Sequence, residues 1–150
     1  ERILVVDVGG GSTELVAGQA GEAPVQAHSF DIGCRRVTEK FLEADPPSDE
    51  ELGRARAWIA AGMRPYFDDL RASGFAPERV VAVAGTAQLA GVGLDERRRT
   101  VGLDPGRAPV IVAGLVILQV VLDLAGMSSF TVSESDILHG IVLESARTGA

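Results

Sequence analysis

The first thirty-three residues alternate between apolar runs and short polar breaks. Arg2 to Val8 (RILVVDV) is rich in β-branched residues, which favour extended chain. The same signal resumes from Thr13 to Ala17 after a glycine run, and again from Val25 to Gly33. The pattern therefore predicts three strands in series, the first two joined as a hairpin.

The pattern then changes to a helical period. Ser48 and Glu51 form a capping box that predicts a helix start. Pro65 is expected to kink or split this helix, and Gly74 with Pro77 to end it. The apolar positions that recur at helical spacing are Leu52, Ala55, Ile59, Met63 and Leu70.

The rest of the chain alternates short strands with helices. Val80 to Ala84 predicts a buried strand, and Ala108 to Leu124 a buried helix, separated by a polar, turn-rich stretch from Leu94 to Arg107. Phe130 to Ser133 predicts a last strand and Asp136 to Ala146 an amphipathic closing helix. Three strands followed by crossover units predict an α/β fold: one mixed five-stranded sheet with helices on both faces.

Composition narrows the class of protein. The chain has 150 residues and a net charge of −7, which fits a single domain and argues against nucleic-acid binding. Cys34 is the only cysteine, so neither a disulfide framework nor a cysteine zinc site is expected. The longest apolar run, Ala108 to Leu118, is too short to cross a bilayer. The default expectation is a cytoplasmic protein without a membrane or nucleic-acid partner.

The glycine run between the first two strands is the strongest chemical signal. Gly9, Gly10 and Gly11 bring successive backbone amides together with no side chains in the way, and Ser12 and Thr13 add hydroxyls. Such a nest of amides binds anions, phosphate above all. The alternative is a glycine-rich hairpin turn, although an ordinary two-residue turn needs only one or two glycines.

Two carboxylates flank this run. Asp7 stands at the end of the first strand and Glu14 follows the hydroxyl residues. A carboxylate beside a phosphate is repelled unless a cation lies between them, and Mg²⁺ accepts carboxylate and phosphate oxygens together. Asp7 is therefore a candidate metal ligand, with Mg²⁺ or Mn²⁺ as the ion, and Glu14 a candidate to hold the same ion or to orient water.

Five stretches of the sequence carry a family resemblance. The stretches, in chain order, are DVGGGSTEL (7–15), DIGCRRVTEKF (31–41), VAVAGTAQ (81–88), GRAPVIVAGLVIL (106–118) and SESDILHGIV (133–142). Together they resemble the exopolyphosphatase and guanosine pentaphosphate phosphohydrolase family. That family belongs to the actin, sugar-kinase and heat-shock-chaperone ATPase superfamily. The resemblance implies that residues 1–150 are one ribonuclease-H-like lobe, the second of a two-lobed enzyme.

The resemblance also implies an activity and a site. The activity would be Mg²⁺-dependent release of orthophosphate from polyphosphate or guanosine pentaphosphate. Asp7 and Glu14 match acidic active-site residues, the amides from Gly9 to Thr13 would hold phosphate, and Gly85-Thr86 matches a second loop facing the cleft. The glutamate that activates water would lie in the first lobe, so this chain alone is expected to be inactive. A homodimer is a further possibility.

Some features leave alternatives open. Arg36 is a candidate phosphate ligand, but a solvated or structurally paired arginine explains it as well. The family spends about twice as many residues between Thr86 and Arg107, so a segment there is expected to be short or missing. Pro109 replaces the usual aspartate, which the first turn of a helix tolerates. An ATP-binding kinase-like module and a non-catalytic phosphate-binding lobe are the other functions considered.

Overall fold

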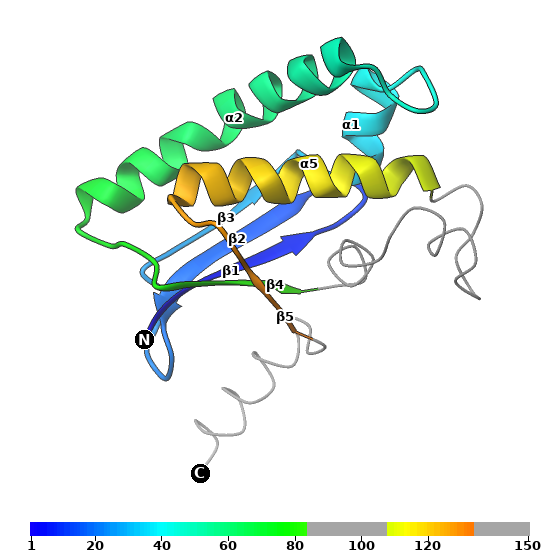
Figure 1. Cartoon of the computed structure of the whole chain (residues 1–150). Coiled ribbons are helices and arrows are strands. Elements are labelled where there is room, and N and C mark those ends of the chain that lie inside the picture. The colour runs from blue at the N-terminus through cyan, green and yellow to red at the C-terminus, as the bar shows by residue number, and fades with distance from the viewer. Residues whose placement is uncertain (84–107, 134–150) are drawn as a thin grey trace.

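The computed structural model describes residues 1–83 and 108–133, and a five-stranded sheet forms its base (Figure 1). The strand order is β3-β2-β1-β4-β5, with β1 antiparallel to β2, β2 antiparallel to β3, and β1, β4 and β5 parallel. The predicted mixed sheet, antiparallel over its first three strands, is confirmed. The strands are β1 (Arg2–Val8), β2 (Thr13–Gln19), β3 (Gln26–Phe30), β4 (Arg79–Val83) and β5 (Thr131–Val132).

Three described helices pack on the same face of this sheet: α1 (Cys34–Phe41), α2 (Asp49–Ala72) and α5 (Ala108–Ala125). Both parallel crossovers step in the same direction, from β1 to β4 and from β4 to β5, so the right-handed rule places their helices on one side. The closing helix expected over 136–146 lies outside the described residues. The same holds for residues 84–107, with the compressed segment between Thr86 and Arg107.

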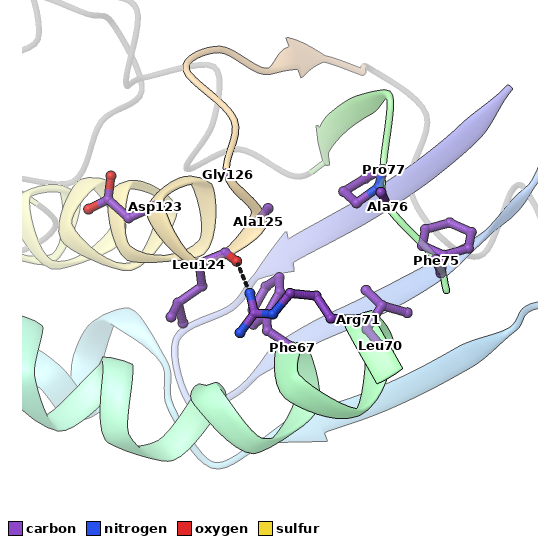
Figure 2. Close-up of a pocket in the computed structure, with 10 residues that line it drawn as sticks. All are labelled: Phe67, Leu70, Arg71, Phe75, Ala76, Pro77, Asp123, Leu124, Ala125 and Gly126. Atoms are coloured by element: carbon purple, nitrogen blue, oxygen red, sulfur yellow. Dashed lines mark hydrogen bonds between the residues drawn. The ribbon is translucent and has the colours of Figure 1, made fainter. Parts of the chain in front are cut away.

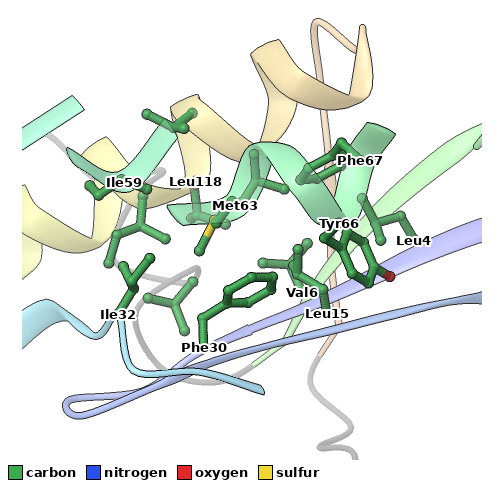
Figure 3. Close-up of a cluster of buried hydrophobic side chains, with 14 of the residues drawn as sticks. Leu4, Val6, Leu15, Phe30, Ile32, Ile59, Met63, Tyr66, Phe67 and Leu118 are labelled. Atoms are coloured by element: carbon green, nitrogen blue, oxygen red, sulfur yellow. The ribbon is translucent and has the colours of Figure 1, made fainter. Parts of the chain in front are cut away.

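The core lies between the sheet and α2 and α5 (Figure 3). Alternate β1 residues, Leu4 and Val6 among them, are fully buried, while their neighbours Val5 and Asp7 are only partly buried on the other face. This alternation is the period-two pattern of a strand with one face on the core. The helical side that meets it carries Ile59, Met63, Tyr66, Phe67, Leu118 and Val121.

Helix α2 begins and ends as its sequence predicts. The Glu51 amide donates to the Ser48 hydroxyl at 3.3 Å, and the Ser48 amide donates to the Glu51 carboxylate at 2.7 Å, completing the capping box. At the other end Gly74 has φ +79 and its amide donates to the Arg71 carbonyl, while the Phe75 amide donates to Leu70. These two bonds form a Schellman motif, which needs glycine at the left-handed position.

Pro65 does not split α2; of the expected kink or split, the split is contradicted. The helix runs without interruption over 24 residues. Pro65 lies on the exposed side, where the carbonyl that loses its amide partner can be hydrated. The buried residues Met63 and Phe67, on either side of it, both belong to the core, so tertiary packing holds the two halves together.

Helix α1 was not expected from the sequence. The predicted third strand extended to Gly33, but β3 ends at Phe30 and a helix begins at Cys34. The signal was short: Cys34, Val37 and Phe41 recur at helical spacing, and Cys34 and Val37 are buried. An eight-residue helix has little stability of its own, so its packing against the core decides its formation.

Glu51 is a buried carboxylate that ties the α1–α2 connection to the start of α2. It is 7 % exposed and accepts the amides of Glu43, Ala44 and Ser48 at 2.8, 3.1 and 2.7 Å. These bonds, that from Ser48 foremost, lower its pKa from 4.5 to about 2. A group whose pKa is lowered by folding stabilises the fold above its unfolded pKa, and that contribution is lost as the pH falls through the folded value.

We expect Glu51→Gln to lower the melting temperature by several degrees at pH 7, because an amide offers one acceptor oxygen for three donors. The difference from the native chain should shrink between pH 4.5 and 2, the window set by the two pKa values. Thermal unfolding followed by circular dichroism across this range checks it. Glu50→Gln, exposed in the same helical turn, is the matched control and should change little.

Candidate phosphate and metal site

The glycine run forms the connection between β1 and β2, at the carboxyl end of β1. The Gly9 amide donates to the Ser12 carbonyl at 2.9 Å, which continues the ladder and leaves Gly10 and Gly11 at the tip. In an ordinary two-residue turn the Gly9 carbonyl would accept the Ser12 amide in return. Here that carbonyl accepts the Cys34 amide instead, at 2.9 Å. The expected hairpin is present, but its turn lacks one of the two cross-strand hydrogen bonds, because the Gly9 carbonyl bonds to α1 instead.

The first turn of α1 holds every carbonyl of the glycine run. The Cys34 amide donates to Gly9 and the Arg35 amide to Gly10, both at 2.9 Å, and Arg36 Nε donates to the Gly11 carbonyl at 2.7 Å. Helix N-termini leave amides without intrahelical partners, and a side chain usually caps them. At α1 the cap residue is Gly33, which has no side chain, so the loop carbonyls serve as the cap.

This arrangement turns three loop amides outward. In a planar trans peptide the carbonyl of one residue and the amide of the next point in opposite directions. Because the carbonyls of Gly9, Gly10 and Gly11 point to α1, the amides of Gly10, Gly11 and Ser12 point away from it. Among the described residues no group accepts a hydrogen bond from these three amides. They form a row of free donors of the kind that binds an anion.

Gly33 makes this contact possible. A Cβ at this position would lie 2.5 Å from the Gly10 oxygen and 2.5 Å from the Gly11 carbonyl carbon, both backbone atoms. No side chain fits there without pushing the loop off the helix. Gly33 was not predicted as a site residue, because Gly10 and Gly11, which it contacts, are distant along the chain. The one local signal was a glycine immediately before a short amphipathic stretch.

Two expected phosphate donors serve the fold instead. The Gly9 amide is bonded to Ser12, as described above. The Thr13 hydroxyl is fully buried and donates to the Ile32 carbonyl at 2.6 Å. That bond ties β2 to the residues that lead into α1. Of the donors expected from residues 9–13, the Gly9 amide and the Thr13 hydroxyl are therefore engaged within the structure.

The two acidic candidates lie side by side on the other face of the sheet. Asp7 and Glu14 are register partners in the β1–β2 ladder, so their side chains project from the same face. Ser29, the register partner of Glu14 on β3, donates its hydroxyl to the Glu14 carboxylate at 2.7 Å. Sequence reasoning missed Ser29, because only the strand register brings it beside Glu14.

The acidic pair suits a hard divalent cation. Carboxylates directly opposite on neighbouring strands repel each other, with Cβ atoms about 5 Å apart, and a cation between them reverses this cost. Within residues 1–83 and 108–133 no three acidic, histidine or cysteine side chains gather into a metal cluster. Mg²⁺ needs no more than one or two carboxylates, since it keeps water and takes phosphate oxygens as its other ligands. Asp7 and Glu14 thus fit the ion.

Arg36 and the Gly85-Thr86 loop are the remaining candidate phosphate ligands. Arg36 contacts the glycine loop, as described, and its guanidinium also lies 3.8 Å from the Asp31 carboxylate. Gly85 and Thr86, expected to form a second loop at the site, lie outside the described residues. In the sequence they follow β4, whose last described residue, Val83, is the register partner of Asp7.

A surface pocket lies at the opposite end of the sheet (Figure 2). It is formed where α2 and α5 end, and Arg71 crosses it to donate to the Leu124 carbonyl at 3.1 Å. Phe67, Leu70 and Phe75 make most of its wall apolar. Because β1 runs from this end toward the glycine run, the pocket is separate from the phosphate and metal candidates.

Comparison with known structures places the fold in a class. A crystal structure of the Aquifex aeolicus member of the Ppx/GppA family superposes with a TM-score of 0.79 and 23 % identity, over 99 % of this chain and 57 % of that one. An exopolyphosphatase-like protein of known structure gives a TM-score of 0.75 and 27 % identity, over 100 % and 60 %. The chain therefore has the actin-like ATPase fold that the resemblance implies.

The family follows from the sequence itself. The family model of the Ppx/GppA phosphatase family matches residues 1–91, and this chain belongs to that family. Exopolyphosphatase 2 of Mycobacterium tuberculosis is 32 % identical over 181 aligned positions, covering 95 % of this chain and 55 % of the relative. The chain thus spans about half the length of such relatives.

That alignment also bears on the expected short segment. It needs 181 positions to place 95 % of a chain of 150 residues, so the relative carries residues that this chain lacks. The family match ends at residue 91, inside the stretch between Thr86 and Arg107. Neither finding says where in the alignment the additional residues lie, so a short stretch between Thr86 and Arg107 stays a prediction.

No described helix is both long and apolar enough to span a membrane. This includes α5, the most apolar of them, in which Gln119 and Asp123 interrupt the apolar residues. The prediction that Ala108 to Leu124 forms a buried helix is confirmed, since α5 spans Ala108–Ala125 and its residues Ala113, Ile117 and Val121 are fully buried in the core.

Proposed function

We propose that this chain is the phosphate- and metal-binding lobe of a phosphatase that hydrolyses phosphoanhydride bonds and releases orthophosphate from inorganic polyphosphate. One observation carries the proposal. Three outward-facing amides lie directly beyond the end of β1, and an in-register pair of carboxylates lies one position before the last pair of the β1–β2 ladder. Family membership and the relatives named exopolyphosphatase support the substrate class.

The chemistry divides between these two groups. The amides of Gly10, Gly11 and Ser12 bind the oxygens of a terminal phosphoryl group and stabilise its charge, without moving, because α1 already holds the loop. Asp7 and Glu14 hold Mg²⁺, which when bound neutralises phosphate charge and orients the chain of phosphates. Hydrolysis of a phosphoanhydride depends mainly on such positioning and charge neutralisation.

The other parts of the catalytic site belong to the first lobe of the family. In this proposal that lobe supplies the glutamate that activates water, and it closes over the phosphate. The relatives named exopolyphosphatase support polyphosphate as the substrate. Guanosine pentaphosphate is the second candidate substrate, for the same chemistry. Both present a terminal phosphoryl group, so the loop and the ion serve either one in the same way.

Ligand binding to the ¹⁵N-labelled chain tests the proposal. We expect Mn²⁺, used as a paramagnetic probe in place of Mg²⁺, to broaden the amide signals of Asp7 and Glu14 first. Tripolyphosphate with Mg²⁺ should then shift the amides of Gly10, Gly11 and Ser12. ATP is the matched comparison, because it carries the same three phosphates with a nucleoside attached.

The outcomes separate the candidate functions. Equal or weaker binding of ATP, with shifts confined to the loop, supports a site that recognises phosphates alone. Clearly tighter binding of ATP with additional shifts would favour a nucleotide-binding module and count against the proposal. Absence of any loop response to tripolyphosphate would refute it.

A further inference from the structure

The glycine loop needs an external support to stay in the orientation that the structure shows. Glycine adopts positive and negative φ with similar ease, so a peptide between glycines can turn over at little cost. Each such turn would reverse one carbonyl and one amide. The row formed by the amides of Gly10, Gly11 and Ser12 therefore persists only if the preceding carbonyls have fixed partners.

Main-chain donors fix the first two of these carbonyls. The amides of Cys34 and Arg35 belong to the first turn of α1, and their positions follow from the helix itself. The third carbonyl, that of Gly11, is held by a side chain, the Nε of Arg36 at 2.7 Å. The orientation of the Ser12 amide thus depends on one residue that mutation can change without altering the helix.

The surroundings of Arg36 fit this role better than direct phosphate binding. Its Nε donates to the Gly11 carbonyl, and one of its two terminal nitrogens, Nη2, lies 3.8 Å from the Asp31 carboxylate. A bound phosphate would compete with that carboxylate. Arg35, the neighbouring arginine, has a side chain that is 73 % exposed and forms an ion pair with Glu39 at 3.9 Å.

We propose that Arg36 is a positioning residue: its Nε holds the Gly11 carbonyl and so directs the Ser12 amide toward the phosphate. This rests on the proposed function of the loop. It differs from the expectation that Arg36 is itself a phosphate ligand. The guanidinium acts through a neutral carbonyl, so its effect on affinity is geometric rather than ionic.

Arg36→Met and the matched control Arg35→Met test the proposal in the ¹³C,¹⁵N-labelled chain. Both variants remove one positive charge from adjacent, solvent-exposed positions, but only the side chain of Arg36 bonds to the loop. Arg35 contacts the loop through its main-chain amide, which the substitution keeps. Without ligand, Arg36→Met should shift the Gly11 carbonyl carbon and the Ser12 amide, while Arg35→Met leaves both in place. For tripolyphosphate with Mg²⁺, Arg36→Met should raise Kd about tenfold and Arg35→Met less than twofold.

Salt dependence separates positioning from direct contact. An ionic contact with phosphate is screened by salt, so removing one would flatten the dependence of Kd on ionic strength. We expect Arg36→Met to keep the native slope. A flattened slope with an unchanged Gly11 carbonyl shift would show that Arg36 is a direct ligand, and equal losses in both variants would show an effect of net charge. Either result overturns the proposal.

The comparison of Arg36→Met with the native chain in the absence of ligand does not depend on the proposed function. If the native chain bound no tripolyphosphate, the phosphate site would be refuted, whereas the Gly11 carbonyl shift in Arg36→Met would still report whether Arg36 orients the loop. An unchanged shift would overturn the positioning role even if the native chain binds tripolyphosphate tightly.

Discussion

Asp7→Asn or Glu14→Gln should lower the rate of orthophosphate release from polyphosphate by at least ~100-fold in the enzyme that joins this chain to the family's first lobe. Each change removes one charge from the in-register pair that we propose as the Mg²⁺ ligands. If the ion acts mainly in the transition state, kcat falls more than the affinity for polyphosphate. Steady-state assays of orthophosphate release with varied polyphosphate and Mg²⁺ measure both.

Glu39→Gln is the matched control for this loss. Glu39 is an exposed acid on α1, 70 % accessible, and its ion pair is with Arg35 and not with the glycine loop. It should keep nearly full activity. The two site variants should also need higher Mg²⁺ concentrations for half-maximal rate. Full activity of Asp7→Asn and Glu14→Gln at low Mg²⁺ would remove both residues from the proposed metal site.

The 150-residue chain by itself should hydrolyse polyphosphate at a rate near background, although it binds phosphate weakly at the loop. Electrostatic stabilisation is strong where donors are preorganised in a site closed to water. A loop on one open lobe leaves the phosphate hydrated, and each contact is screened. The proposed water-activating glutamate belongs to the other lobe as well.

Orthophosphate release by the purified chain, with and without an added first lobe from a relative, measures this. Activity that returns only on addition of the first lobe supports the division of the site between two lobes. A rate for the chain alone close to that of a two-lobed relative would contradict it. Loop amide shifts with tripolyphosphate, recorded on the same sample, show that an inactive chain is still folded.

Local patterns in the sequence determined most of the secondary structure. The β-branched residues of Arg2–Val8 predict a strand. The structure confirms it and buries Leu4 and Val6 on one of its faces. The capping box of Ser48 and Glu51 determined where α2 begins, because both partners lie within one helical turn. The glycine run from Gly9 to Gly11 likewise predicted the candidate phosphate loop, because its local sequence leaves successive backbone amides without side chains.

Where local sequence preference and tertiary packing disagree, tertiary packing determines the secondary structure. Pro65 weakens a helix by itself, but the core residues Met63 and Phe67 on either side of it keep α2 continuous. Helix α1 is too short to be stable alone, and forms because Val37 is buried and because the loop carbonyls cap its amides. Propensity is a weak prior against such contacts.

The sequence by itself identified the loop, the acidic pair and the family. Only the tertiary structure decided which amides face outward, that Gly33 must be a glycine, and that Ser29 bonds to Glu14 and Arg36 to the Gly11 carbonyl. The physical reason is distance along the chain. The Cys34 amide meets the Gly9 carbonyl across 25 residues, a contact that neither periodicity nor spacing encodes and that follows only when β3 returns the chain to the loop.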